Sequence, residues 1–169
     1  MKKILIGFIL IFLDFDLNFG SVSIGLLPDF IGYHFLKEGI TEFENQSSHF
    51  KKVEELIMPF FILSLIIYAF DLLTITAAMG YASLILTALS AGMGFYASYH
   101  IIRGFSDMGI NTKKLETLWK IMLCAHAITL ALNFVHIISI LVGLVALVST
   151  VLFLSEFNNI KNAKNGGTL

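Results

Sequence analysis

The chain has 169 residues, of which 57% are hydrophobic and 14% are charged, and its formal net charge is −1. Ordinary soluble domains carry about 45–50% apolar and about 25% charged residues, so a water-soluble protein of this size could not hide the excess of apolar side chains. The composition therefore indicates an integral membrane protein whose main partner is the lipid bilayer, and it argues against nucleic acid as a partner. The single cysteine, Cys124, excludes an internal disulfide.

Six apolar runs follow one another along the chain. A membrane-spanning helix needs about 20 residues, and the runs are close to this length. They are residues 4–19, 21–40, 53–76, 77–102, 115–133 and 136–154. Ser47 or Ser48 is expected to cap the third helix, and Asn111 or Thr112 the fifth. We therefore expect an all-α polytopic membrane helix bundle with six transmembrane segments.

The basic residues fall on only one side of these six segments. The eleven Lys and Arg residues lie at the two termini and in the second and fourth loops, while the other side holds acidic residues. The positive-inside rule then predicts a multi-pass protein of the cell membrane with both its N- and C-termini in the cytoplasm. The first run is not expected to be a cleaved signal sequence, because it lacks a small-residue cleavage site and ends on acidic residues.

The helices fall into pairs that resemble one another in sequence. The triplet Phe15-Asp16-Leu17 near the end of the first run matches Phe70-Asp71-Leu72 near the end of the third. This similarity suggests three helical hairpin repeats, and the alternative is that membrane interfaces select the same amino acids in unrelated helices. Residues 1–160 are expected to form a single integral membrane helical domain, and residues 161–169 a short polar C-terminal tail.

A proline and a carboxylate interrupt the second apolar run. Proline is tolerated in the first turn of a helix, and Asp29 would be favoured there by the helix dipole. We therefore expect the second helix to run from Pro28 to about Phe43, with residues 18–27 irregular and either re-entrant or in the outer interface. The alternative is one helix from Ser21 that is kinked at Pro28.

The segment Leu27–Tyr33, written LPDFIGY, is followed by a loop rich in Lys and Glu. This segment, together with the general helix pattern, resembles a set of small, uncharacterised bacterial multi-pass membrane proteins. The resemblance implies no activity.

Polar side chains inside a bilayer are costly, so each is a candidate functional residue. His126 lies about halfway along the fifth segment, on one stripe with Thr129, Asn133 and His136. Polar stripes also run along the third segment, through Ser64, Tyr68 and Asp71, and along the fourth, through Ser83, Thr87, Ser90 and Gly94. Three such stripes facing inward would form a polar cavity open to the outside. The candidate intramembrane site comprises His126, Asn133, His136, Asp71, Asp16 and Asp29.

The alternative interpretation assigns these residues to helix packing, interhelical hydrogen bonds and capping in the headgroup region. The sequence holds no catalytic motif, and we expect no catalytic residue, no cofactor and no metal. The leading hypothesis is a non-catalytic accessory, sensor or scaffold subunit, working as a homo-oligomer or with a membrane partner protein. The alternative is a small transporter or channel-like protein with a polar intramembrane cavity, and a lipid-acting enzyme is the third hypothesis.

Overall fold

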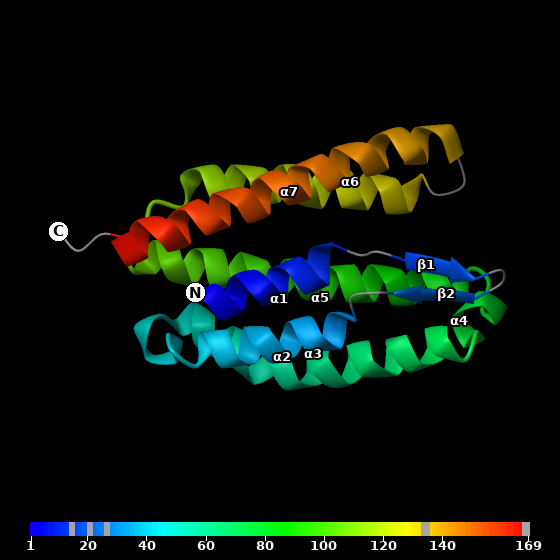
Figure 1. Cartoon of the computed structure of the whole chain (residues 1–169), viewed down its shortest axis with the longest axis horizontal. Helices are drawn as coiled ribbons and strands as arrows, with labels where there is room; N and C mark the ends of the chain where they lie inside the picture. The colour runs from blue at the N-terminus through cyan, green and yellow to red at the C-terminus, as the bar shows by residue number, and fades with distance from the viewer. Residues whose placement is uncertain (14–15, 20–21, 26–27, 133–135, 167–169) are drawn as a thin grey trace.

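A computed structural model describes residues 1–13, 16–19, 22–25, 28–132 and 136–166. This part of the chain is an elongated bundle of antiparallel helices whose two termini lie at the same end (Figure 1). The elements are α1 (Lys2–Phe12), β1 (Asp16–Phe19), β2 (Val22–Gly25), α2 (Asp29–Ile40), a 3₁₀ turn (Glu44–Gln46), α3 (Ser48–Leu72), α4 (Ile75–Ala78), α5 (Ala82–Asp107), α6 (Lys113–Ala131) and α7 (His136–Gly166). The described chain is helical apart from the short β-hairpin and the connecting turns.

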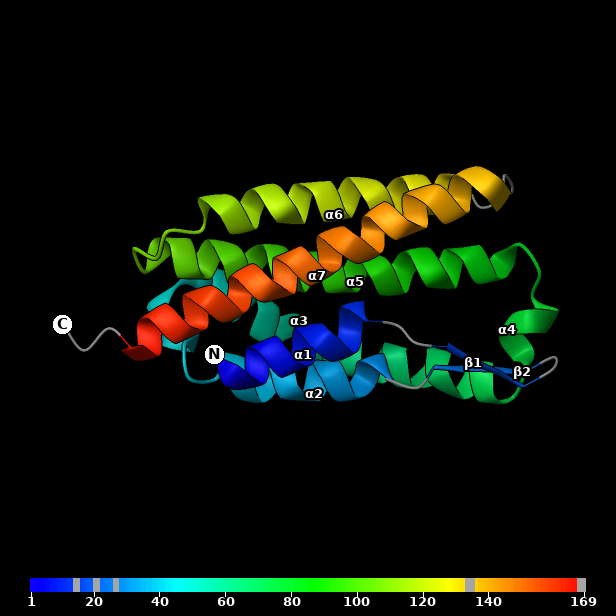
Figure 2. The same cartoon turned by 45° about the horizontal axis from the view of Figure 1, so that its top comes forward.

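The long elements form three antiparallel pairs, α1 with α2, α3 with α5, and α6 with α7 (Figure 2). Helices α1, α3 and α6 begin at the end of the bundle that holds the termini, and α2, α5 and α7 finish there. All eleven Lys and Arg residues consequently lie in that half of the bundle. The β-hairpin and α4 lie at the opposite end.

The prediction that residues 4–19 form a single helix is wrong. Helix α1 ends at Phe12, and β1 then pairs with β2 so that Asp16 lies opposite Gly25 and Phe19 opposite Val22. Asp and Asn are weak helix formers, whereas the β-branched residues of β2 favour strands. An eleven-residue helix is only about 17 Å long, roughly half of the hydrocarbon thickness, and the hairpin continues from it toward the far end.

The break predicted at Pro28 is confirmed. Pro28 has extended backbone, with φ −64° and ψ 126°, and is the N-cap residue of α2, which begins at Asp29. The alternative of one continuous helix from residue 21 is wrong, because residues 22–25 form a strand. The strand also replaces the irregular backbone expected there. Helix α2 ends at Ile40, before the predicted end at Phe43.

The backbones of α1 and α2 touch through glycines. A Cβ atom on Gly7 would lie 2.7 Å from the Leu36 side chain and 2.8 Å from the Gly32 carbonyl oxygen. A Cβ atom on Gly32 would lie 2.9 Å from the Gly7 carbonyl oxygen. Small residues at helix crossings allow such an approach in membranes. The contact fixes the height of α2 in the bundle, and with it the position of Asp29.

Helix α3 begins with the capping interaction expected from the sequence. The Ser47 hydroxyl accepts a hydrogen bond from the His49 backbone N–H at 3.1 Å and donates to Asp107 Oδ2 at 2.5 Å. The second bond joins the start of α3 to the end of α5. Thr112 is the N-cap residue of α6, but it is the Asn111 side chain that accepts from a backbone N–H, that of Lys113, at 3.3 Å.

The fourth helix begins later than predicted, at Ala82 rather than residue 77. The chain reverses between α3 and α5 through two positions in the left-handed region, Thr74 with φ 57° and Gly80 with φ 56°. The four-residue helix α4 lies between them. The turn carries Thr76 to the same end of the bundle as the last turn of α3.

Aromatic side chains join the α6–α7 pair to the rest of the bundle. The Phe8 ring lies 5.7 Å from Phe153 and 5.3 Å from Phe157, measured between centroids. Trp119 Nε1 donates to the Ser98 hydroxyl at 2.9 Å, which links α6 to α5. Helix α7 runs to Gly166, so most of the predicted polar tail, residues 161–169, is helical.

Within the part of the chain that the structure describes, three helices are long and apolar enough to cross a membrane, rather than the six predicted. They are α3, α5 and the part of α7 from Ile140 to Lys164. Helices α1 and α2 are too short, and the first eight residues of α6 include Lys113, Lys114, Glu116 and Lys120. The three long helices support association with a membrane.

The glycine contact between α1 and α2 can be tested against a glycine in open space. Gly32→Ala should lower the free energy of unfolding by about 1–3 kcal/mol, because the added methyl group must displace packed atoms. Gly92→Ala is the matched control, since a Cβ atom there meets nothing within 4 Å. Thermal unfolding in detergent checks both variants, and an equal effect of the two would contradict the close contact.

Candidate functional site

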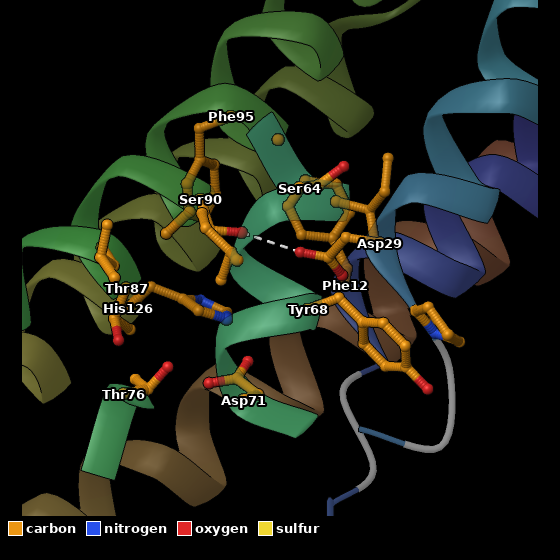
Figure 3. A pocket seen from close by; sticks show the side chains of 16 residues that line it. Phe12, Asp29, Ser64, Tyr68, Asp71, Thr76, Thr87, Ser90, Phe95 and His126 are labelled. Atoms are coloured by element: carbon orange, nitrogen blue, oxygen red, sulfur yellow. Dashed lines mark hydrogen bonds between the residues drawn. The ribbon is translucent and has the colours of Figure 1, made fainter. Parts of the chain in front are cut away.

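A polar cavity of about 410 Å³ is lined by residues of α1, α2, α3, α4, α5 and α6, and Figure 3 shows their side chains. Small-molecule sites commonly measure about 300–1,000 Å³. Residues distant in sequence supply its polar lining, chiefly Asp29, Ser64, Tyr68, Asp71, Thr87, Ser90 and His126. Three of the six candidate residues, Asp29, Asp71 and His126, therefore share one cavity.

Asp29 enters the cavity from the start of α2. The Ser90 hydroxyl of α5 donates to Asp29 Oδ2 at 2.8 Å, so the carboxylate is held by a neighbouring helix (Figure 3). Its place in the first turn of α2 also favours the negative charge, because a helix N-terminus carries a partial positive charge. The ring of Phe30 lies 5.5 Å from that of Tyr68, which places the start of α2 beside that turn of α3.

Helix α3 presents one polar face to the cavity. Ser64, Tyr68 and Asp71 are spaced i, i+4 and i+7, so they lie on the same side of the helix. The Ser64 hydroxyl donates to the Phe61 carbonyl oxygen at 3.0 Å. Asp71 is three residues beyond Tyr68, or roughly 4.5 Å further along the helix axis. The two carboxylates of the cavity therefore lie at different depths, with Asp71 nearer the end of the bundle.

His126 points its imidazole ring into the cavity from α6 (Figure 3). Its Nδ1 lies 2.8 Å from the Met122 carbonyl oxygen. A carbonyl oxygen can only accept, so Nδ1 must carry the proton of this hydrogen bond. In the neutral ring Nε2 then holds a lone pair. The Phe95 ring, 5.3 Å away, packs against the imidazole. His126 can therefore accept a proton or a hydrogen bond from a solute.

The other predicted residues divide into two groups. Ser83 and Thr129 bond to their own backbone, to the Gly80 carbonyl oxygen at 2.7 Å and the Ala125 carbonyl oxygen at 2.9 Å, and do not line the cavity. The position of Asn133 lies outside the described residues, as do the side chains of Asp16 and His136.

Sequence reasoning missed two polar features. Thr76 Oγ1 is buried at the cavity wall and has no hydrogen-bond partner within the described part of the chain. His49 and His100 face each other at the opposite end of the bundle, with their Nδ1 atoms 2.7 Å apart. No local pattern signals either feature, because one depends on the turn after α3 and the other on the pairing of α3 with α5.

Asp29, Asp71 and His126 belong to residue types that can ligate metal ions. Among residues that the structure describes, no three His, Cys, Asp or Glu side chains lie close enough together to hold a metal ion. Asp29, Asp71 and His126 therefore share a cavity without converging on one point. The lining can instead bind a solute that is long enough to contact more than one of these three side chains.

No family model matches the chain, and the searches of curated proteins and of solved structures also find no match. The resemblance carried by residues 27–33 stays a prediction. The function must be inferred from the cavity itself.

The bond between Ser90 and Asp29 predicts a measurable coupling between two helices. In a double-mutant cycle of Ser90→Ala and Asp29→Ala, the two changes should couple by about 0.5–3 kcal/mol in the free energy of unfolding. The cycle of Thr87→Ala with Asp29→Ala is the control, since Thr87 Oγ1 donates to the Ser83 carbonyl oxygen instead. Additive effects in the first cycle would show that the Ser90 bond does not hold Asp29.

Proposed function

We propose that this protein is a multi-pass membrane protein that binds a small cationic solute in the polar cavity and acts as a small transporter. The observation that carries the proposal is the convergence of two carboxylates and a histidine lone pair, from three different helices, on one cavity. All three accept protons or hydrogen bonds. Carboxylates can form ion pairs with organic cations, and acidic side chains inside a membrane commonly mark the pathway of a solute.

Six crossings of the cell membrane, with both termini in the cytoplasm, fit this proposal. Helix α1 with β1, and β2 with α2, would each cross once, and the ladder between the strands pairs backbone groups that a bilayer cannot satisfy. The basic end of the bundle would face the cytoplasm by the positive-inside rule. The three helix pairs would then be three hairpins in one orientation, and the cavity would open to the outside.

The basic end of the bundle is packed with aromatic side chains. Phe50, Phe105 and Phe157 are fully buried there, with the Phe50 and Phe105 ring centroids 5.2 Å apart and those of Phe105 and Phe157 5.8 Å apart. A solute in the cavity would therefore be blocked on this side. In the alternating-access model, a transporter exposes its binding site to only one side of the membrane in each state. A cavity that is open on one side and blocked on the other fits this model.

The second candidate is a non-catalytic accessory, sensor or scaffold subunit that binds a membrane partner or a second copy of the chain. The broad apolar face of α7 favours it, with Ile140 65% and Leu141 60% exposed. Lipid would also cover such a face. The exposed face of α7 is therefore weaker support for an accessory subunit than the cavity is for a transporter. An enzymatic role has less support, because the Ser64 and Ser90 hydroxyls donate to Phe61 and Asp29 rather than to His126.

Neutralising one carboxylate tests the proposed function. In proteoliposomes, a panel of radiolabelled methylammonium, choline and putrescine should include at least one cation that is taken up. Asp71→Asn should reduce that uptake about tenfold or more, because the variant removes one of the two carboxylates that line the cavity. Glu55→Gln is the matched control, since Glu55 is an exposed carboxylate at the other end of α3.

Equal uptake by the wild type, by Asp71→Asn and by empty vesicles would refute transport through the cavity. A protein that co-purifies with one partner and tolerates Asp71→Asn would favour the accessory subunit.

A further inference from the structure

Two histidines join α3 to α5 at the basic end of the bundle. The Nδ1 atoms of His49 and His100 lie 2.7 Å apart, and the two ring centroids lie 5.0 Å apart. The His100 side chain is only 8% exposed, and its ring centroid lies 4.5 Å from that of Tyr96 and 5.2 Å from that of Tyr99. These aromatic contacts hold His100 in place opposite His49.

The contact between the two Nδ1 atoms depends on a single proton. A ring nitrogen donates when it carries a proton and accepts when it does not, so one Nδ1 must donate and the other must accept. When both rings are protonated, both Nδ1 atoms carry a proton and neither can accept. The hydrogen bond is then lost, and two positive charges face each other across the interface of α3 and α5, where like charges repel.

Charged groups on several helices lie at this end of the bundle. Lys52 of α3 adds a positive charge that acts on His100. Described carboxylates on the neighbouring helices have partners of their own, which are Lys3 for Glu38 of α2 at 3.1 Å, Ser47 for Asp107 of α5, Arg103 for Glu116 of α6 at 3.7 Å, and Lys114 for Glu156 of α7 at 2.6 Å. A second positive charge on the histidine pair would therefore add to that of Lys52.

The aromatic packing that closes the basic end lies in the same interface. Phe50 directly follows His49 in α3, and its ring centroid lies 5.2 Å from that of Phe105 in α5. A Cβ atom on Gly104 would lie 2.7 Å from the Phe50 ring, so this ring is in close contact with α5. A movement of His49 away from His100 would therefore also withdraw Phe50 from this packing.

We propose that His49 and His100 form a proton-sensitive latch between α3 and α5, which holds the basic end of the bundle closed. Acidification protonates both rings, breaks their hydrogen bond and separates the start of α3 from the end of α5. The latch is therefore closed at neutral and higher pH and open at low pH. This inference goes beyond the proposed function and does not depend on which solute the cavity binds.

The distance between spin labels on the two helices tests the latch. Lys51→Cys and Ser106→Cys, in a Cys124→Ser background of the full-length chain, place one label on α3 and one on α5 at the basic end. Double electron–electron resonance in nanodiscs should show a longer distance as the pH falls from about 8 to about 5, the range in which histidine ordinarily titrates. His49→Gln should remove this pH dependence, because glutamine keeps a donor and an acceptor but does not titrate.

His34→Gln is the matched control for the latch. His34 is an exposed histidine of α2, its Nε2 lies 3.4 Å from Glu38 Oε1, and it does not belong to the pair, so this variant should keep the pH-dependent distance. A wild-type distance that does not change with pH would overturn the latch, and so would an equal change in His49→Gln. If His49→Gln does not fold, His100→Gln takes its place, and an equal change in that variant would overturn the latch in the same way.

Discussion

The close approach of α1 and α2 at Gly7 and Gly32 is the contact on which the rest of the structure depends. It holds two helices that are each too short to cross a bilayer, and it sets the height at which α2 begins. That height places Asp29 beside α5, where its side chain is partly buried. The Ser90 hydroxyl then reaches the carboxylate from α5, and the cavity opens beside it.

The backbone N–H groups in the first turn of a helix have no partner within that helix. A helix that begins within a bundle needs other partners for them. Proline at the N-cap removes one donor, and the β1–β2 ladder pairs the backbone of the segment that precedes it. Non-helical backbone at membrane depth is tolerated where protein packs around it or where it lines a water-filled cavity. The break at Pro28 therefore separates the hairpin from the helix that brings Asp29 to the cavity.

Features set by local chemistry could be predicted from the sequence. The break at Pro28 follows from the fixed φ of proline, and the Ser47 cap from its hydroxyl. The polar face through Ser64, Tyr68 and Asp71 follows from helical spacing. The sequence did carry a signal for the end of α1 at Phe12, because residues 13–19 alternate apolar and polar side chains as strands do, but the prediction counted them as one apolar run. The pairing of His49 with His100 depends on how α3 and α5 pack, which no local pattern specifies.

The central claim is that a water-filled cavity opens at the end of the bundle opposite the termini. Labelling of single cysteines in a Cys124→Ser background, with a membrane-impermeant maleimide on intact cells, tests it most directly. Thr87→Cys should react from outside because Thr87 lines the cavity, whereas Ile85→Cys should not, because this 70% exposed side chain does not line the cavity and would face lipid. If Thr87→Cys reacts only after the cells are permeabilised, or no faster than Ile85→Cys, the cavity does not open to the outside.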